Sequence, residues 1–529
     1  MIFVRGIRLP LEAGRQQAFE QALRILRLGW GQVAQCAVAK LSVDARHGKP
    51  VLVYTVAVTL NDEGAEPALA GAAPCVAISK KAPLVLGRGH ARLAGVPVVC
   101  GLGPAGLFSA LVLARQGFAP IVLERGPALD ERVRAVEEFY TAGRLDPNAN
   151  IQFGEGGAGT FSDGKLTTRI GDELCGFVTD TLLRHGAPED IAYRHKPHIG
   201  TDLLRGVIRS IRAEIEALGG RVMFNTALTG LVERGGRLCA VQTTAGELPC
   251  QALVLAVGHS ARDTFEMLAA AGLPLVCKPF SVGLRAEHLQ ETIDRGLYHQ
   301  AAGHPALPKG EYQLSQRLAG RCVYTFCMCP GGQVVAAASE ENGVVTNGMS
   351  YHARDGQNAN AAVVVSVNEA DFDGDAMKAI AFQRGLEKAA YQAGGGGYRA
   401  PAETLGSFLQ GGGELCLGRV QPTYSRGVSP FDLGSLLPEP LAGALRDGLR
   451  AFGRRLPGYD APDTVLTGLE TRTSSPVRIE RGENRQCLAM PGVYPCGEGA
   501  GYAGGIMSAA VDGVRVARAI VETYAVPQL

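Results

Sequence analysis

Residues 96–126, VPVVCGLGPAGLFSALVLARQGFAPIVLERG, decide the expected fold. The apolar run at 96–100 predicts a buried strand, 107–116 predicts a helix, and 120–123 predicts a second strand. The glycine-rich turn GLGPAG stands between the first strand and the helix, at 101–106. Strand, tight turn, helix and strand in this order are typical of a parallel sheet covered by helices, so we expect an α/β fold.

The glycine spacing of this turn is typical of a dinucleotide-binding site. Gly101 permits the tight turn, Gly103 lets the backbone approach a pyrophosphate, and Gly106 lets the helix pack close to the strand. Pro104 and Ala105 begin the helix, whose free N–H groups and positive dipole end face the phosphates. A tight turn without a ligand is the simpler alternative, but the position between a strand and a helix favours dinucleotide binding.

Glu124 ends the second predicted strand, 18 positions after Gly106. A carboxylate at this place can accept hydrogen bonds from both ribose hydroxyls of a dinucleotide. It also disfavours a 2′-phosphate, so NADP is not expected at this site.

The composition of the 529-residue chain, with 46% hydrophobic and 19% charged residues, indicates a folded globular protein. Its 52 Lys and Arg against 51 Asp and Glu leave a net charge of +1, which gives no chain-wide positive field for a phosphate polymer. We therefore expect a small-molecule substrate and no nucleic-acid partner. Thirteen scattered cysteines and a short N-terminal apolar run favour a cytoplasmic location over secretion.

Residues 93–114 contain no charged side chain and are about as long as a membrane-spanning helix. GLGPAG lies inside this stretch, and three glycines and a proline would break a single helix. We therefore expect a strand, a turn and a helix here, and no membrane insertion.

Four segments are expected along the chain. Residues 1–92 predict a small N-terminal α+β module, with a helix at about 13–28 and a strand at 51–60. Residues 93–278 predict the first part of the nucleotide-binding domain, and 279–464 an inserted mixed α/β substrate domain. Residues 465–529 predict a second part of the nucleotide-binding domain, so that domain is discontinuous.

Three motifs resemble those of the glutathione-reductase-like flavoprotein superfamily, whose FAD-binding domain is Rossmann-type. The first is GLGPAG followed by IVLERG. The second, ALVLAVGHSAR at 252–262, is similar to a strand ending in Ala-Thr-Gly, with Val257 in place of Thr. The third, at 493–520, is similar to the C-terminal FAD motif with its Gly-Asp pair, with Glu498 in place of Asp. The resemblance implies non-covalent FAD rather than NAD, and besides the turn and Glu124 it implies these FAD contacts: Arg125, Leu228 through its backbone, Gly258, Gly497, Glu498, Gly505 and Ile506.

A closer resemblance is to a bacterial and archaeal family of uncharacterised FAD-dependent dehydrogenases. The segments that carry it are IQFGEGGAGTFSDGKLTTR at 151–169, KPHIGTD at 196–202, PFSVGLRAEH at 279–288, VYTFCMCPGGQVV at 323–335, TNGMS at 346–350 and ETRTSSPVRI at 470–479. This resemblance covers most of the chain and implies a flavin redox enzyme of unassigned substrate.

The loop GEGGAGTFSDGK at 154–165 has five glycines in the eleven residues up to Gly164. Such a loop offers clustered backbone N–H groups to a flavin or its phosphates. The family resemblance implies that Gly157, Thr160, Ser162 and Lys165 line the cofactor, with Lys165 stabilising an anionic reduced flavin. A flexible surface loop is the alternative.

Cys327 and Cys329 suggest a redox role, because thiols near a flavin can exchange electrons with it. Flavin disulfide reductases carry their redox cysteines in a CxxxxC motif soon after the first dinucleotide-binding unit, and no such motif occurs at that place here, so structural thiols in an apolar strand are the favoured alternative. Together with Cys322 these residues lack the fourth ligand and the spacing of a metal site, and no metal is expected.

Arg472 could clamp an anionic substrate through bidentate hydrogen bonds, with a structural ion pair as the alternative. His198, His259 and His288 lie beside motifs, and for each a structural histidine is favoured over an acid–base role.

The sequence has no second GxGxxG in a strand–turn–helix setting. We therefore expect an FAD-dependent oxidoreductase of the dehydrogenase kind, which passes a hydride between an organic substrate and FAD. One alternative is a flavin reductase or monooxygenase with NAD(P)H as a transient electron donor. Another is a non-catalytic, flavin-binding regulatory protein.

Overall fold

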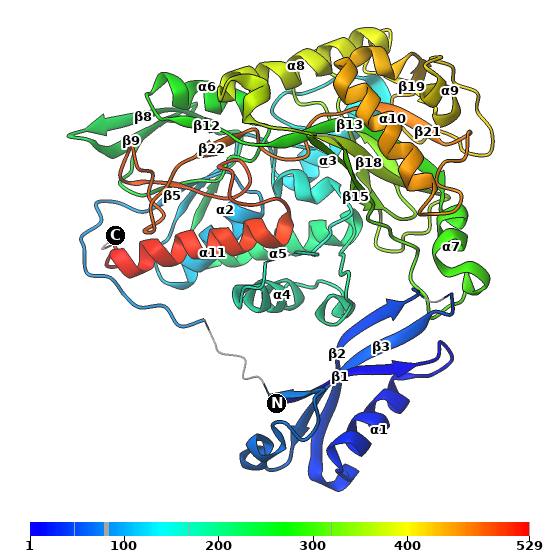
Figure 1. The fold of residues 1–529 in the computed structure, drawn as a ribbon. Coiled ribbons are helices and arrows are strands. Elements are labelled where there is room, and N and C mark those ends of the chain that lie inside the picture. Colours follow the sequence, from blue (N-terminus) through cyan, green and yellow to red (C-terminus); the bar gives the residue numbers. More distant parts are fainter. Residues whose placement is uncertain (47, 79–83, 169, 319, 528–529) are drawn as a thin grey trace.

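The computed structural model describes residues 1–46, 48–78, 84–168, 170–318 and 320–527. These residues form an N-terminal module, a parallel-sheet domain built from two separate segments of the chain, and a large sheet domain that lies between those segments in sequence (Figure 1). The expected α/β fold class is confirmed at this level.

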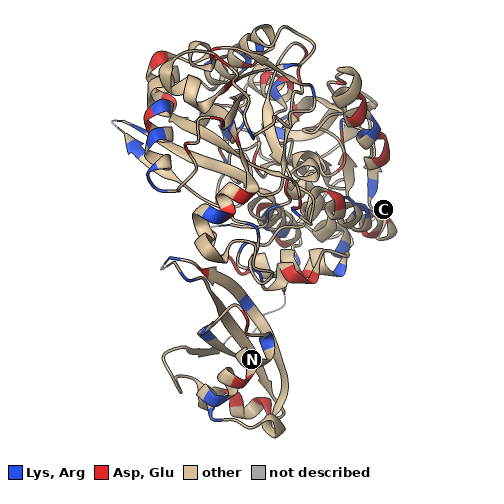
Figure 2. Cartoon of the chain, turned by 90° about the vertical axis from the view of Figure 1, so that its right-hand side faces the viewer, with Lys and Arg blue, Asp and Glu red and all other residues tan. Residues whose placement is uncertain are grey.

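The N-terminal module is an antiparallel sheet of order β2-β3-β1-β4 with one helix packed on it. Its elements are β1 (Ile2–Leu9), α1 (Arg15–Leu26), β2 (Val33–Asp44), β3 (Val51–Leu60) and β4 (Val76–Ile78). The expected helix and strand are confirmed as α1 and β3. The module projects from the rest of the molecule, and Lys and Arg are interspersed with Asp and Glu in both parts (Figure 2).

One strand edge joins this module to the next part. Leu41 N donates to Tyr193 O at 2.7 Å, and His195 N donates to Leu41 O at 2.9 Å. Segment 193–195 thus continues the sheet beyond β2.

The second part is built on five parallel strands in the order β23-β11-β5-β6-β7. Along the chain these strands are β5 (Val98–Cys100), β6 (Ile121–Leu123), β7 (Arg221–Met223), β11 (Leu253–Leu255) and β23 (Val493–Pro495). The strand order reverses at β5, and ligands of such sheets bind outside the carboxyl ends of the strands at this switch point.

Helices cover one face of this sheet, and a three-stranded sheet with further helices covers the other. The helices are α2 (Pro104–Arg115), α3 (Leu129–Ala142), α4 (Leu174–Arg184), α5 (Thr201–Ala217), α6 (Arg262–Ala270) and α11 (Ile506–Thr523). The small sheet contains β8 (Leu228–Arg234), β9 (Arg237–Thr243) and β10 (Gly246–Pro249). The charge-free stretch forms β5 and α2, and α2 is buried from Ala105 to Ala114. No helix in the described ranges is long and apolar enough to cross a bilayer.

The third part is a seven-stranded sheet of order β14-β15-β18-β13-β21-β19-β20. Its strands are β13 (Phe280–Leu289), β14 (Ser315–Leu318), β15 (Arg321–Cys329), β18 (Asn358–Val367), β19 (Ala400–Thr404), β20 (Val428–Pro430) and β21 (Val465–Glu470). Its helices are α7 (Gln290–Tyr298), α8 (Ala376–Ala393), α9 (Leu405–Gln410) and α10 (Glu439–Gly453), and a hairpin of β16 (Gln333–Ala336) and β17 (Thr346–Met349) accompanies them.

The chain passes between the second and third parts through β12 (Leu275–Cys277) and β22 (Val477–Ile479), which pair with each other. The expected boundary at 464 needs a correction, because β21 pairs with β13 and β19 inside the seven-stranded sheet. The second passage therefore follows residue 470 rather than preceding residue 465.

Candidate functional site

The GLGPAG turn lies at the carboxyl end of β5, where the strand order reverses. A Cβ on Gly101 would overlap Ala256 O, and a Cβ on Gly106 would overlap Gly101 O. A Cβ on Gly103 would instead have Gly157 Cα, 3.9 Å away, as its nearest neighbour. Packing therefore demands the first and third glycines, whereas Gly103 faces open space of the kind a phosphate group requires.

The N-termini of two helices meet the glycine-rich loop at this place. A Cβ on Gly159 would lie 3.2 Å from Ile506 Cγ1 on α11 and 3.7 Å from Pro104 Cγ on α2. Gly103 and Gly505 are the N-cap residues of these helices, so no side chain caps either one. Each helix presents the positive end of its dipole to this place, which suits an anionic group.

Glu124 is the carboxylate beside the turn. Its Oε1 accepts hydrogen bonds from Gly126 N at 2.9 Å and Gly154 N at 3.0 Å, and its Oε2 accepts one from Leu102 N at 2.9 Å. A carboxylate has about four lone-pair sites, so Oε2 retains capacity for a ribose hydroxyl. These bonds also fix the carboxylate against the turn and the loop.

Arg132 supports the same loop through hydrogen bonds to its backbone, a role that its sequence context does not indicate. Its buried guanidinium donates to Asn150 O at 3.0 Å, Gly154 O at 3.3 Å and Glu155 O at 2.6 Å. Burial lowers the pKa of Arg132 to about 9. An arginine on a helix with mixed polarity gives no sequence signal for such a role.

The predicted loop residues have different surroundings. Gly157 faces Gly103, whereas the Thr160 hydroxyl donates to Glu155 O at 3.2 Å and is buried. The Ser162 hydroxyl donates to Gly159 O at 2.9 Å. Thr160 and Ser162 therefore shape the loop in this structure, and their hydroxyls are already engaged.

Arg125 lines a cavity of about 370 Å³ between α6 and α8. Its guanidinium lies 4.6 Å from the centre of the Phe153 ring and 2.7 Å from Asp263 Oδ2. Of the remaining predicted contacts, Gly258 has φ 75° with open space beside it, Gly497 packs against Ala105 of the turn, and Leu228 begins β8.

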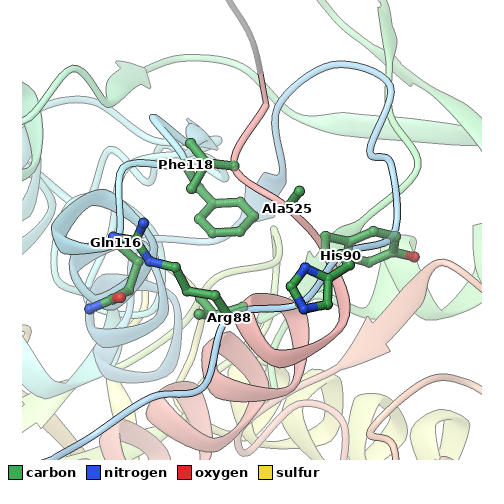
Figure 3. A pocket seen from close by; sticks show the side chains of 9 residues that line it. Arg88, His90, Gln116, Phe118 and Ala525 are labelled. Atoms are coloured by element: carbon green, nitrogen blue, oxygen red, sulfur yellow. The ribbon is translucent and has the colours of Figure 1, made fainter.

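A second cavity, of about 230 Å³, lies at the opposite end of the parallel sheet. Arg88, His90, Gln116, Phe118 and Ala525 line it (Figure 3). Gln116 and Phe118 lie between the end of α2 and the start of β6, at the amino ends of the strands. This cavity is therefore separate from the nucleotide turn.

Glu498 follows Gly497 after β23 and retains partial exposure. Burial raises its carboxyl pKa to about 7, against the opposing effect of the Lys278 charge. Its protonation state therefore changes near neutral pH.

Lys165 lies in a cluster of paired charges between the loop and the seven-stranded sheet. Its ammonium lies 3.1 Å from Glu311 Oε1 and also donates to Met328 O. Burial alone would lower the Lys165 pKa, but the Glu311 and Asp163 charges raise it overall. Arg354 completes the cluster, with its Nε 3.1 Å from Asp163 Oδ1 and its Nη1 3.6 Å from Glu311 Oε2.

Cys327 and Cys329 lie beside this cluster at an irregularity of β15, where Cys327 has φ 41°. Burial raises the pKa of the Cys329 thiol to about 11, and desolvation by the surrounding protein raises the pKa of the Cys327 thiol as well, although the Cys327 residue as a whole is exposed. Both thiols are therefore protonated near neutral pH, which disfavours nucleophilic or redox thiolate chemistry. The described residues contain no group of three His, Cys, Asp or Glu side chains arranged to hold a metal ion.

Arg472 is held in a buried ion pair. Its Nε and Nη2 lie 3.0 and 2.8 Å from the two carboxylate oxygens of Glu387, and Arg262 reaches the same oxygens at 2.7 and 2.8 Å. Burial opposes ionisation of Glu387, but the two arginines hold its pKa well below the usual range. The expected anion clamp needs a correction here, because the Glu387 carboxylate already occupies the bidentate face of Arg472.

The structure also shows what surrounds the three histidines that lie beside motifs, His198, His259 and His288. Burial and the charges of Arg472 and Arg262 lower the pKa of His259 to about 4. His198 Nε2 lies 3.0 Å from His352 O, and His288 Nε2 lies 2.7 Å from Tyr459 O.

A protein of Clostridium beijerinckii, described only as uncharacterised, is 49% identical to this chain over 436 residues. The match covers 82% of this chain and 82% of that protein. The chain belongs to the same family as this clostridial protein. Residues 279–473 match the family described as FAD-dependent protein, C-terminal domain-like, a range that includes every strand from β13 to β21.

Several solved structures show distant likeness. A geranylgeranyl bacteriochlorophyll reductase-like protein of Thermoplasma acidophilum is 12% identical, with 80% of this chain and 77% of that chain covered and a TM-score of 0.34. L-Amino acid deaminase of Proteus vulgaris is 12% identical, with 84% and 97% covered and a TM-score of 0.32. Glycine oxidase of Bacillus cereus is 10% identical, with 80% and 94% covered and a TM-score of 0.31. At such TM-scores these likenesses carry no functional argument.

Proposed function

We propose that this protein is an FAD-dependent oxidoreductase that binds FAD non-covalently at the carboxyl end of β5. The observation that carries the proposal is the open space at Gly103, where the two helix N-termini and the glycine-rich loop meet. The match of residues 279–473 to a domain of FAD-dependent proteins supports FAD as the dinucleotide.

Several residues would hold the cofactor in this proposal. The N-terminus of α2 would bind the pyrophosphate, Glu124 would bind a ribose hydroxyl, and Arg125 would lie beside the adenosine end. The N-terminus of α11 would bind the electron-rich edge of the flavin ring. When bound, FAD supplies two-electron redox chemistry.

We further propose a dehydrogenase that accepts a hydride from an organic small molecule in the cytoplasm. The described residues contain one parallel sheet with a glycine-rich nucleotide turn, so a second dinucleotide is not required by the fold. The strand order and the three-stranded sheet support assignment of the domain as glutathione-reductase-like. A transient NAD(P)H donor is the competing form of the same proposal.

Anaerobic titration of the FAD-loaded protein with NADH and then NADPH tests the electron source. We expect the flavin absorbance near 450 nm, an approximate value for oxidised flavins, to persist with both nucleotides and to bleach with an organic substrate found by screening. Stoichiometric bleaching by either nucleotide would instead establish the reductase or monooxygenase form.

A further inference from the structure

One face of the seven-stranded sheet lies toward the glycine-rich loop and Lys165. Phe326 on β15 and Arg285 on β13 are both in register with Ala362 on β18, so their side chains share this face. Val323 belongs to the opposite face, where it packs against Gly448 of α10. Tyr324 lies two positions before Phe326 and therefore also faces the loop.

This face presents a wall of accessible, uncharged side chains around the buried Arg285. Tyr324, Phe326 and Asn347 are partly exposed, and Cys327 is exposed. Phe326 belongs to no hydrophobic cluster and to no aromatic pair among the described residues. A partly exposed aromatic side chain that belongs to no cluster is suited to contact a ligand ring.

Hydrogen bonds from Arg285 bring the members of this wall together and use every N–H group of this arginine. Its Nη1 donates to Cys327 O at 3.0 Å and to Asn360 Oδ1 at 3.1 Å. Its Nη2 donates to Asn347 Oδ1 at 3.3 Å and to Glu470 Oε1 at 2.7 Å, and its Nε donates to Glu470 Oε2 at 3.0 Å. All five donors are therefore used.

Four further cations of the described residues near the wall are also engaged or screened. Lys165 is paired with Glu311, Arg354 with Asp163, and Arg472 with Glu387. Lys196 donates to Glu311 O at 3.1 Å, and its side chain is 39% exposed, so solvent screens its charge. A carboxylate buried against this wall would find these four cations, all in the described part of the chain, already engaged or screened.

Asn347 provides one unpaired polar group. Its Oδ1 accepts from Arg285 and from Gly348 N at 2.7 Å, which orients the amide. No acceptor for its Nδ2 occurs in the described part of the chain, and this atom is not among the buried polar atoms without partners, so it is accessible. The Nδ2 group can therefore donate to a ligand carbonyl oxygen.

We infer that the substrate is a neutral, planar ring compound with a carbonyl group, whose ring contacts Phe326 and whose oxygen accepts from Asn347 Nδ2. This inference rests on the proposed FAD site, because the wall becomes a substrate surface only opposite a flavin. Anionic acids of the same size are disfavoured because burying a carboxylate without a partner is costly.

Equilibrium dialysis of the FAD-loaded protein against acetophenone and against benzoate tests the inference. The two probes have nearly the same shape and differ in charge. We expect acetophenone to bind at least about tenfold more tightly, which corresponds to about 1.4 kcal/mol. Equal binding, tighter binding of benzoate, or no binding of either probe would overturn the inference.

Variants locate the binding to the wall. Phe326→Ala and Asn347→Leu should each weaken acetophenone binding about fivefold or more while FAD content stays at the wild-type level. Leu488→Ala, at a side chain that is 65% exposed, is the control and should leave binding unchanged. Wild-type acetophenone affinity in both wall variants would refute the assignment of the binding site to this wall. The comparison of acetophenone with benzoate uses the wild-type protein, so it does not depend on whether the variants fold. A protein that cannot bind FAD would refute the proposed function instead.

Discussion

Replacing Gly103 with alanine separates cofactor binding from folding. Gly103 has φ −74° and ψ −178°, a conformation that alanine adopts without strain. The added methyl would meet only Gly157 Cα at 3.9 Å, which is ordinary van der Waals distance. The apo-protein should therefore keep its stability or gain about 0.4–1 kcal/mol, because alanine restricts the unfolded chain.

The same methyl should obstruct FAD. It occupies the space through which the backbone approaches a pyrophosphate, and hydrogen bonds to charged groups contribute about 1.5–3 kcal/mol. Loss of one such contact weakens binding about 10- to 100-fold. Gly106→Ala should behave in the opposite way, because its methyl overlaps Gly101 O and overpacking costs about 1–3 kcal/mol of folding stability.

The assay combines thermal unfolding of the apo-protein with FAD titration followed by protein-bound flavin absorbance. Gly206→Ala, on α5 with nothing near the added methyl, is the matched control for both measurements. An apo-stable Gly103→Ala variant that binds FAD like the wild type would refute the placement of the pyrophosphate.

Four further predictions concern individual side chains. Glu124→Ala removes the acceptor of three backbone N–H groups, so it should lower the unfolding free energy of the apo-protein by about 3 kcal/mol or more in denaturant titration. It should also weaken FAD binding, and an unchanged FAD affinity would contradict the assignment of Glu124 to the ribose. Glu498→Gln should stabilise the protein over wild type most strongly above pH 7, by up to about 3 kcal/mol, and this gain in unfolding free energy should fade toward pH 4.5. The reason is that folding raises the carboxyl pKa from 4.5 to about 7, so the ionised wild-type carboxylate destabilises the fold at high pH. A gain that does not change with pH would refute this pKa shift. Cys327 should react with iodoacetamide slowly at pH 7, and its rate should rise about tenfold per pH unit through pH 9, whereas fast labelling at pH 7 would reveal a thiolate. Glu387→Gln should destabilise the protein by about 3–5 kcal/mol in denaturant titration because it leaves Arg472 without its carboxylate; a loss below about 1 kcal/mol would show that the pair is not buried in solution.

The local elements around the nucleotide turn were predictable because short-range patterns determine them. The apolar run, the glycines and the following helix coincide with β5, the turn and α2, since each depends on neighbours within a few positions. The charge-free stretch was also correctly separated from a membrane helix, because three glycines and a proline cannot continue one helix.

The long-range pairings were not predictable from the same patterns. Nothing near Arg472 in the sequence indicates Glu387, which is 85 positions away, so the ion pair could not be chosen over an anion clamp. Arg285 and Glu470 are 185 positions apart and pair inside a strand that is buried on both faces. A charged residue within the apolar strand FSVGLRAEHL was the available signal, because such a charge requires a buried partner.

The boundary at 464 was misplaced for a related reason. The apolar sequence of the strand Val465–Glu470 fits the parallel sheet and the seven-stranded sheet equally well. Only its register with β13 and β19 assigns it, and register is a tertiary property.

The central claim is that this chain binds FAD non-covalently at the carboxyl end of β5. The most direct measurement is the amount and identity of flavin released when the purified, FAD-equilibrated and desalted protein is denatured with acid. We expect about one FAD per chain in the supernatant and a colourless precipitate. A protein that retains no flavin after equilibration with FAD, while its thermal unfolding shows that it is folded, would contradict the claim.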